Sequence, residues 1–141
     1  MEPFATLALS DASRSTAGIL LVTVVAIAFG GWFLTTIARG KEQATPFQRS
    51  FFVAGHAHAG VLVILGLVCQ VFVDATTLDG PMLAIARSGV PLAAILMSAG
   101  FFLSAMGRGT TRPNRLIVLL WLGAASLVAG VLTLGIGLLI V

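Results

Sequence analysis

The chain has 141 residues, of which 58% are hydrophobic and 9% are charged, and its net charge is +3. Soluble globular domains carry about 25% charged residues, so this composition excludes a water-soluble fold and predicts an integral membrane protein. Most of the basic residues fall in two short loops and do not line one element. That distribution is typical of membrane orientation and argues against a nucleic-acid-binding face.

The first apolar run covers about residues 16–38 and reaches the ~20 residues that a membrane helix needs. The lead before it carries Glu2 and Asp11 against Arg14, and no A-x-A cleavage site closes the run. We therefore expect a retained first span and not a signal peptide.

The second, third and fourth apolar runs cover about residues 50–73, 82–106 and 116–139. Pro91 lies inside the third run. Because proline has no N–H, it cannot bond the carbonyl of residue 87, and a kink is expected there. Arg87 lies near the outer end of this run, where its stem can reach the interface. We expect it to act as an interface anchor that pairs with Asp74 or Asp79.

Four spans in a single domain over residues 1–141 predict an all-α fold, and the short loops predict an antiparallel transmembrane bundle. The first and third loops hold six of the eight basic residues. The positive-inside rule places these loops in the cytoplasm and both termini outside. The lone Cys69 excludes an intrachain disulfide.

Membrane helices associate through small residues, because lipid provides no hydrophobic driving force between them. The fourth span carries such residues at spacings of three and four, which places them on one helix face: Gly123, Ser126, Gly130, Thr133 and Gly137. Stripes of this kind indicate tight packing within a bundle. Alternatively, one stripe joins copies of the chain, and we expect a homo-oligomer or a subunit of a larger membrane complex.

The chain has two histidines, His56 and His58, and both lie in the second run. An ionisable side chain inside a membrane helix is costly and is by default a functional-site hypothesis. His58 lies eight residues into the span, or ~12 Å, near the middle of a ~30 Å hydrocarbon core. Counting eight residues in from the basic loops on the other three spans reaches the small residues Gly30, Ser98 and Gly123. Met97 lies next to Ser98. The predicted binding candidates are His56, His58, Ser98 and Met97, with close packing at Gly30, Gly55, Gly60 and Gly123.

The spacing of the two histidines directs them ~160–200° apart on a helix, so one helix cannot bring both to one metal ion. Three functional hypotheses remain open: an axial ligand for haem, a proton or ion relay, and a copper or zinc site at His58 completed by Met97, another helix or a second chain. The metal site is the least favoured, because the spans hold no carboxylate and one thiol.

The alternative to these hypotheses is structural: both imidazoles bond neighbouring helices in an accessory subunit. The chain shows no carboxylate pair, no nucleophile with a base and no phosphate loop, so we do not expect an enzyme.

Four stretches together resemble a group of small integral membrane proteins common in actinobacteria: residues 46–49, 54–65 with the core AGHAHAG, 91–104 and 111–117. The resemblance covers most of the chain from the first span onward. It implies a four-helix protein of the bacterial cytoplasmic (inner) membrane and implies no activity. The pair His56 and His58, followed by Gly66, is also similar to histidine helices of haem-copper-oxidase-related proteins. Those proteins carry further histidines on other helices, and this chain has none.

Overall fold

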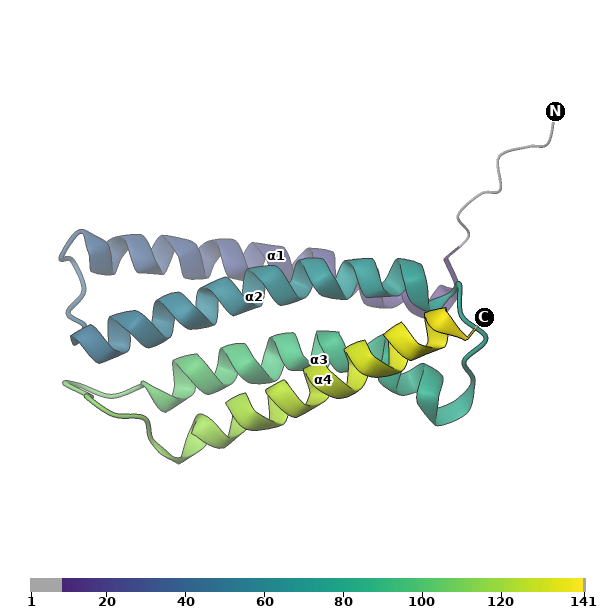
Figure 1. The fold of residues 1–141 in the computed structure, drawn as a ribbon. Helices are drawn as coiled ribbons and strands as arrows, with labels where there is room; N and C mark the ends of the chain where they lie inside the picture. Colours follow the sequence, from purple (N-terminus) through teal and green to yellow (C-terminus); the bar gives the residue numbers. More distant parts are fainter. Residues whose placement is uncertain (1–8, 141) are drawn as a thin grey trace.

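The computed structural model describes residues 9–140. It consists of four α-helices and one short 3-10 helix (Figure 1): α1 (Asp11–Ala38), α2 (Pro46–Val73), α3 (Gly80–Ser104), η1 (Arg115–Ile117) and α4 (Val118–Leu139). All four α-helices are long and apolar enough to cross a membrane, with η1 extending the fourth. Within residues 9–140 there is no strand. The predicted all-helical fold with four membrane-length helices is confirmed.

The first two helices begin earlier than their apolar runs because polar residues cap them. At the start of α1, the Ser10 hydroxyl accepts a hydrogen bond from the Ser13 backbone N–H. At the start of α2, Thr45 and Gln48 form a capping box, and Pro46 occupies the first turn, where its missing N–H costs nothing. The two helices therefore extend beyond their hydrophobic residues at these ends.

The helices contact one another in chain order. α2 and α3 form the centre, α1 packs chiefly against α2, and α4 packs chiefly against α3. Figure 1 shows the α1–α2 and α3–α4 connections at one end of the molecule and the α2–α3 connection at the other, together with the end of α4. The buried core is divided into three apolar clusters along the helix axes.

The small-residue stripe of α4 faces α3 within the same chain. A Cβ built on Gly89 would lie 2.6 Å from the Cα atom of Gly130, so the two backbones touch. The Ser126 hydroxyl donates a hydrogen bond of 2.9 Å to the Gly89 carbonyl. A Cβ on Gly123 would lie 2.5 Å from Met97 Cγ. The stripe thus serves tight packing inside the bundle, the first of the two interpretations of its spacing.

Pro91 does not break α3, which continues through it, although the helix changes direction part way along its length (Figure 1). The carbonyl of Arg87, which Pro91 cannot bond, accepts a hydrogen bond of 3.0 Å from Nε2 of Gln70 on α2. Gln70 is fully buried. A side chain of the neighbouring helix thus satisfies the carbonyl that the proline leaves free.

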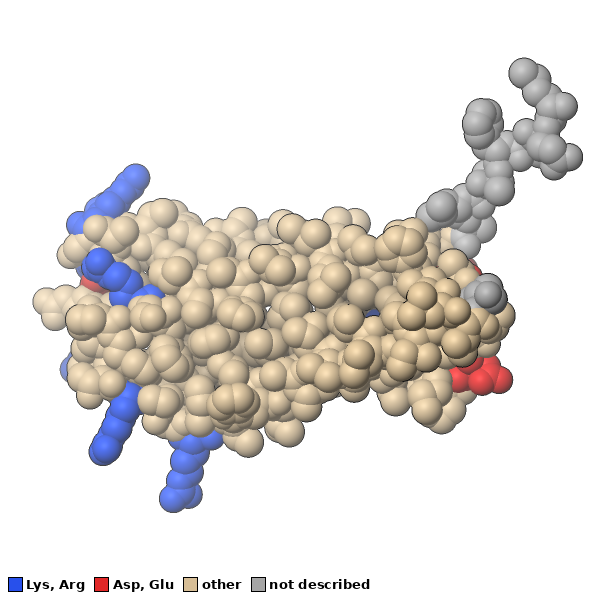
Figure 2. All heavy atoms as spheres, viewed as in Figure 1, with Lys and Arg blue, Asp and Glu red and all other residues tan. Residues whose placement is uncertain are grey.

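Charged side chains lie at the two ends of the molecule. On the face drawn in Figure 2, basic side chains gather at the end formed by the α1–α2 and α3–α4 connections, and an acidic patch marks the opposite end. The surface between them is built from apolar side chains, many of them large and exposed, such as Val22, Ile64 and Trp121. An exposed apolar belt of this extent is what a lipid-facing surface requires.

Candidate functional site

His56 lies against the pair of glycines in α1. A Cβ on Gly31 would lie 3.2 Å from Cε1 and 3.4 Å from Nε2 of the His56 ring, and a Cβ on Gly30 would lie 3.5 Å from Nδ1. The imidazole therefore packs directly on the α1 backbone. Alanine at Gly31 would force the ring to shift by a few tenths of an ångström.

His56 also lines an apolar groove of about 280 Å³. Seven lining residues come from α1, three from α2 and five from α3, so α2 is the floor and the other two helices are the walls. Deep residues such as Leu20 and Val63 are each 5% exposed, whereas Ile19 and Ile95 are 66% and 65% exposed at the rim. The groove therefore opens sideways, on the exposed apolar surface of the bundle.

Ser98 lines the same groove, and its hydroxyl oxygen is buried without a hydrogen bond to any described residue. Neither ring nitrogen of His56 makes a hydrogen bond within residues 9–140. The two threonines of the groove differ, because Thr16 bonds the Ala12 carbonyl and Thr23 bonds the Leu20 carbonyl. A buried polar group without a partner costs about 1–3 kcal/mol. The Ser98 oxygen is such a group and is closed off from the groove surface, whereas the His56 ring is half-buried and lines the groove.

His58 faces α3 and not the groove. Its Nδ1 lies 2.8 Å from the Ala54 carbonyl oxygen on its own helix, and its ring centroid lies 5.0 Å from that of Phe101. Because a carbonyl only accepts, Nδ1 is the donor and the neutral ring keeps Nε2 as an acceptor. The rings of the two histidines face different neighbouring helices, as their spacing predicts.

The remaining sequence candidates lie around the site but mostly do not touch the histidines. Met97 packs on Gly123 of α4, and a Cβ on Gly55 would lie 2.9 Å from Phe101. Gly60, expected to be a point of close packing, has open space around it, since a Cβ added there would meet no atom within 4 Å. Of the four expected glycines, only Gly30 borders a histidine ring.

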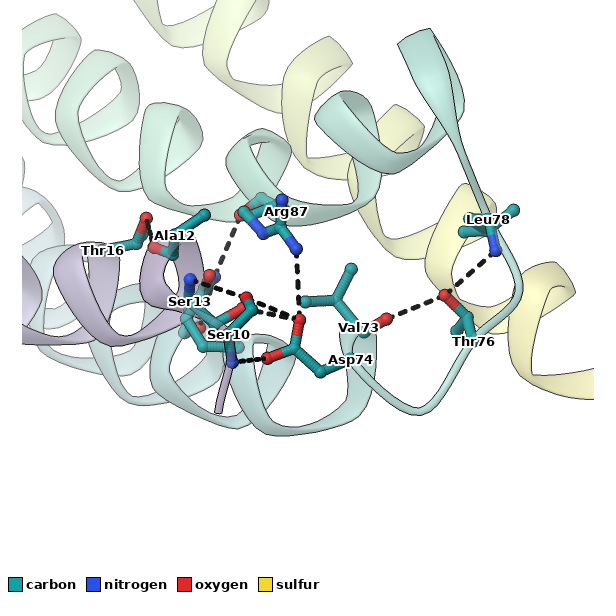
Figure 3. A network of polar contacts seen from close by, with 11 residues as sticks. Ser10, Ala12, Ser13, Thr16, Val73, Asp74, Thr76, Leu78 and Arg87 are labelled. Carbon is teal, nitrogen blue, oxygen red and sulfur yellow. Dashed lines mark hydrogen bonds and ion pairs between the residues drawn. The ribbon is translucent and has the colours of Figure 1, made fainter. Parts of the chain in front are cut away.

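Arg87 belongs to a polar network at the end of the molecule that holds the α2–α3 connection (Figure 3), where its Nη2 lies 3.1 Å from Asp74 Oδ1. Asp74 also accepts hydrogen bonds from the Ser10 backbone at 2.8 Å, the Ser10 hydroxyl at 2.9 Å and the Ser13 hydroxyl at 3.0 Å. Burial raises the pKa of Asp74, but the bonds from Ser10, Ser13 and Arg87 outweigh it and hold that pKa below its usual value. The expected pairing of Arg87 with Asp74 is confirmed, and the network joins α1, α2 and α3.

Two residues of these sites were missed in the sequence. Gly31 touches His56 more closely than Gly30 does, and the adjacent glycine pair was the available signal. Gln70 satisfies the Arg87 carbonyl, and the proline four residues after Arg87 signals that some donor must do so. Residues 9–140 hold no group of three or more His, Cys, Asp or Glu side chains able to bind a metal ion.

Fold and site together define an all-helical chain with four membrane-length helices and a lateral groove that contains a histidine and a serine. Comparisons with protein-family models, with curated proteins and with solved structures gave no match for this chain.

Proposed function

We propose that this chain is a binding protein of the bacterial cytoplasmic membrane whose lateral groove holds a molecule dissolved in the lipid. One observation carries the proposal: an apolar groove between α1, α2 and α3, with no Asp, Glu, Lys or Arg in its lining, opens on the exposed apolar surface and contains His56. The volume of about 280 Å³ lies just below the ~300–1,000 Å³ typical of small-molecule pockets.

In this proposal the four helices span the membrane as an antiparallel bundle with both termini outside. The support is the segregation of charge, since basic side chains gather at the end that holds the first and third connections (Figure 2). By the positive-inside rule that end is cytoplasmic. The opening of the groove then lies at the level of the hydrocarbon core, where a lipid-dissolved molecule can enter.

A binding role fits the groove better than a haem site or a proton relay at His56. The ring nitrogens of His56 lie against Gly30 and Gly31, so the position that a metal would take is occupied by the α1 backbone. A relay needs a continuous series of titratable or polar groups. Along the groove the only other polar side chains are Ser98 and two threonines that are already bonded to their own helix.

The proposal is tested with 1-aminoanthracene, a small neutral fluorescent probe, and the purified protein in nanodiscs. Trp32 follows Gly31 directly in α1, so energy transfer from Trp32 reports on the groove in a Trp121→Phe background. We expect saturable transfer that Ala26→Phe abolishes, since Ala26 lines the groove. Ala28→Phe is the control, because Ala28 is exposed on the same helix outside the groove. Transfer that does not saturate, or that both variants change equally, would overturn the proposal.

A second candidate function is favoured by the geometry of His58. A metal-binding histidine usually donates its other ring N–H to a carbonyl or carboxylate, and Nδ1 of His58 is bonded to the Ala54 carbonyl in this way. Nε2 is therefore free to act as an axial ligand of a haem shared between two copies of the chain. Haem titrated into the protein should give a Soret band that His58→Ala removes and His56→Ala keeps. If neither the probe nor haem binds, an accessory role remains, in which both histidines serve helix packing.

A further inference from the structure

A second site lies at the basic end of the molecule, on a face of α2 that does not line the groove at His56. We propose that this face binds one anionic phospholipid from the leaflet at that end, with the lipid phosphate at Arg49 and an acyl chain along the helix. The site is separate from the groove and depends only on the membrane span proposed above. A hollow, an arginine without an acidic partner, the surrounding charge and a fixed helix end support the assignment.

The hollow is an open space of about 620 Å³ on one face of α2 and the connection before it. Polar residues line it at the start of the helix and apolar residues farther along: Arg49 and Ser50, then Val53, Ala54 and Ala57, with Ala44 and Pro46 at its end. Arg49 and Ala57 are ~12 Å apart along the helix axis. Because Ala54 and Ala57 have small side chains, they leave room on the helix surface for part of a hydrocarbon chain.

Arg49 is an exposed cation that no acidic side chain pairs with inside residues 9–140. Neither of the two ion pairs in that part of the chain involves it. Glu42 lines a neighbouring hollow that Arg49 also borders, but at a separation that makes no ion pair. Among the described residues that line the hollow on α2, none carries a carboxylate. The hollow therefore suits phosphate, which a guanidinium binds through two parallel hydrogen bonds, and it offers no partner to the ammonium group of a zwitterionic lipid.

The charge around the hollow also matches an anionic lipid. Six of the eight basic residues lie in or beside the α1–α2 and α3–α4 connections, together with one acidic residue, Glu42, and basic side chains gather at this end in Figure 2. Basic groups at a membrane surface attract anionic lipids over about a Debye length. This attraction brings such lipids to the basic end, and the hollow at Arg49 determines where one of them binds.

The end of α2 that carries Arg49 is held in place by the rest of the bundle. Nε2 of Gln48 donates hydrogen bonds to the carbonyls of Ala105 at 2.9 Å and Gly107 at 2.7 Å. The Arg49 backbone N–H donates to the Thr45 carbonyl at 2.9 Å. These bonds fix the backbone of Arg49 while its side chain stays exposed. A site on a fixed helix positions a ligand more precisely than a site on a loop, which distinguishes Arg49 from the basic residues of the connections.

Native mass spectrometry of the detergent-solubilised protein with dioleoylphosphatidylglycerol tests this site. We expect one phosphatidylglycerol molecule to bind more tightly than dioleoylphosphatidylcholine, the zwitterionic comparison. Arg49→Gln should weaken phosphatidylglycerol binding roughly tenfold, the loss of one charge-assisted hydrogen bond, and Arg49→Lys should weaken it less. Arg112→Gln is the matched control, because Arg112 is an exposed arginine of the same end that does not line the hollow.

The acyl chain is tested by filling the hollow. Ala57→Phe should weaken phosphatidylglycerol binding, whereas Ala28→Phe, at an exposed alanine of α1, should not. Equal affinity for the two lipids would overturn the anionic headgroup, and equal losses in Arg49→Gln and Arg112→Gln would show attraction by the whole basic end without a site. Unchanged binding in Ala57→Phe would overturn the placement of the chain. Binding of 1-aminoanthracene should be the same in Arg49→Gln and wild-type protein, so the two sites fail or stand separately.

Discussion

Pro91 and Gln70 act as a pair at the residue scale. The proline leaves the Arg87 carbonyl without its helical donor, and Gln70 Nε2 donates to that oxygen from α2. We predict that Gln70→Leu lowers the free energy of unfolding by about 1 kcal/mol, the magnitude of a hydrogen bond between membrane helices. Unfolding of the purified protein in mixed micelles measures this change.

The control for the pair is a double-mutant cycle with Pro91→Ala. Alanine restores the backbone N–H, so the Arg87 carbonyl regains a donor within α3, and Gln70→Leu should then cost less. An equal cost of Gln70→Leu in both backgrounds would show that the two residues are not coupled through this carbonyl.

Asp74 makes the stability of the bundle depend on pH. Its pKa lies below the ordinary value of 3.8 in the folded protein. The folded state therefore binds this proton less readily than the unfolded state, and Asp74 stabilises the fold above about pH 4. That contribution is lost as the pH falls through the lowered pKa. We predict that the melting temperature drops between pH 6 and pH 3 in wild-type protein and that Asp74→Asn flattens this drop.

Asp74→Asn should also lower stability at neutral pH by about 1.5–3 kcal/mol, since it removes a charged acceptor of hydrogen bonds from Ser10, Ser13 and Arg87. Asp79→Asn is the matched control, because Asp79 makes no side-chain hydrogen bond at the start of α3. If the two variants show the same pH profile, the network at Asp74 is not the source of the pH dependence.

The histidines show that residue spacing predicts the directions of side chains on one helix but does not predict a groove between helices. A separation of two positions predicts rings on different sides of α2. In the structure the His56 ring packs against the glycines of α1, and the His58 ring faces Phe101 of α3. The number of residues into the apolar run singled out His58 as the candidate, whereas the histidine that lines the groove is His56. Depth follows from a count along one helix, but a groove depends on how three helices are spaced, and no single helix encodes that spacing.

At the scale of the elements, backbone contact between α3 and α4 controls how these helices pack. A Cβ on Gly130 would lie 2.9 Å from the Cα atom of Gly89, and a backbone atom cannot rotate away as a side chain can. We predict that Gly130→Ala destabilises the bundle by about 1–3 kcal/mol. Gly135→Ala on the same helix should be nearly neutral, because nothing lies within 4 Å of its Cβ position. Comparable losses in the two variants would mean that the contact is not the cause.

The number of helices was predictable because each apolar run is long enough to span hydrocarbon and polar residues separate one run from the next. Their starting residues were not, since Ser10 and the box of Thr45 and Gln48 extend the helices past the apolar residues. The small-residue stripe of α4 indicated close approach but not its partner. Any helix with a matching small residue would satisfy such a stripe, and the structure assigns it to α3 through Gly89.

At the scale of the whole molecule, charge and hydrophobic surface divide the chain into a basic end, an apolar belt and an acidic end (Figure 2). The belt follows from composition alone. The groove does not follow from composition, because it exists only where α1 packs on α2 and stays apart from α3 along the exposed apolar side. That arrangement leaves a groove whose floor is buried and whose opening lies on the exposed apolar surface.

The proposed orientation is tested by labelling cysteines from one side of the membrane. Cys69 is buried, and Cys69→Ala provides a background without thiols. We predict that Thr77→Cys, in the α2–α3 connection, reacts with a membrane-impermeant maleimide in intact spheroplasts. Gln43→Cys and Thr111→Cys, in the two basic connections, should react only after permeabilisation. All three positions are exposed, so an unreactive site reports on the membrane and not on burial. The reverse pattern would place the basic connections outside, in conflict with the positive-inside rule, and labelling of all three in intact spheroplasts would mean that the helices do not span the bilayer.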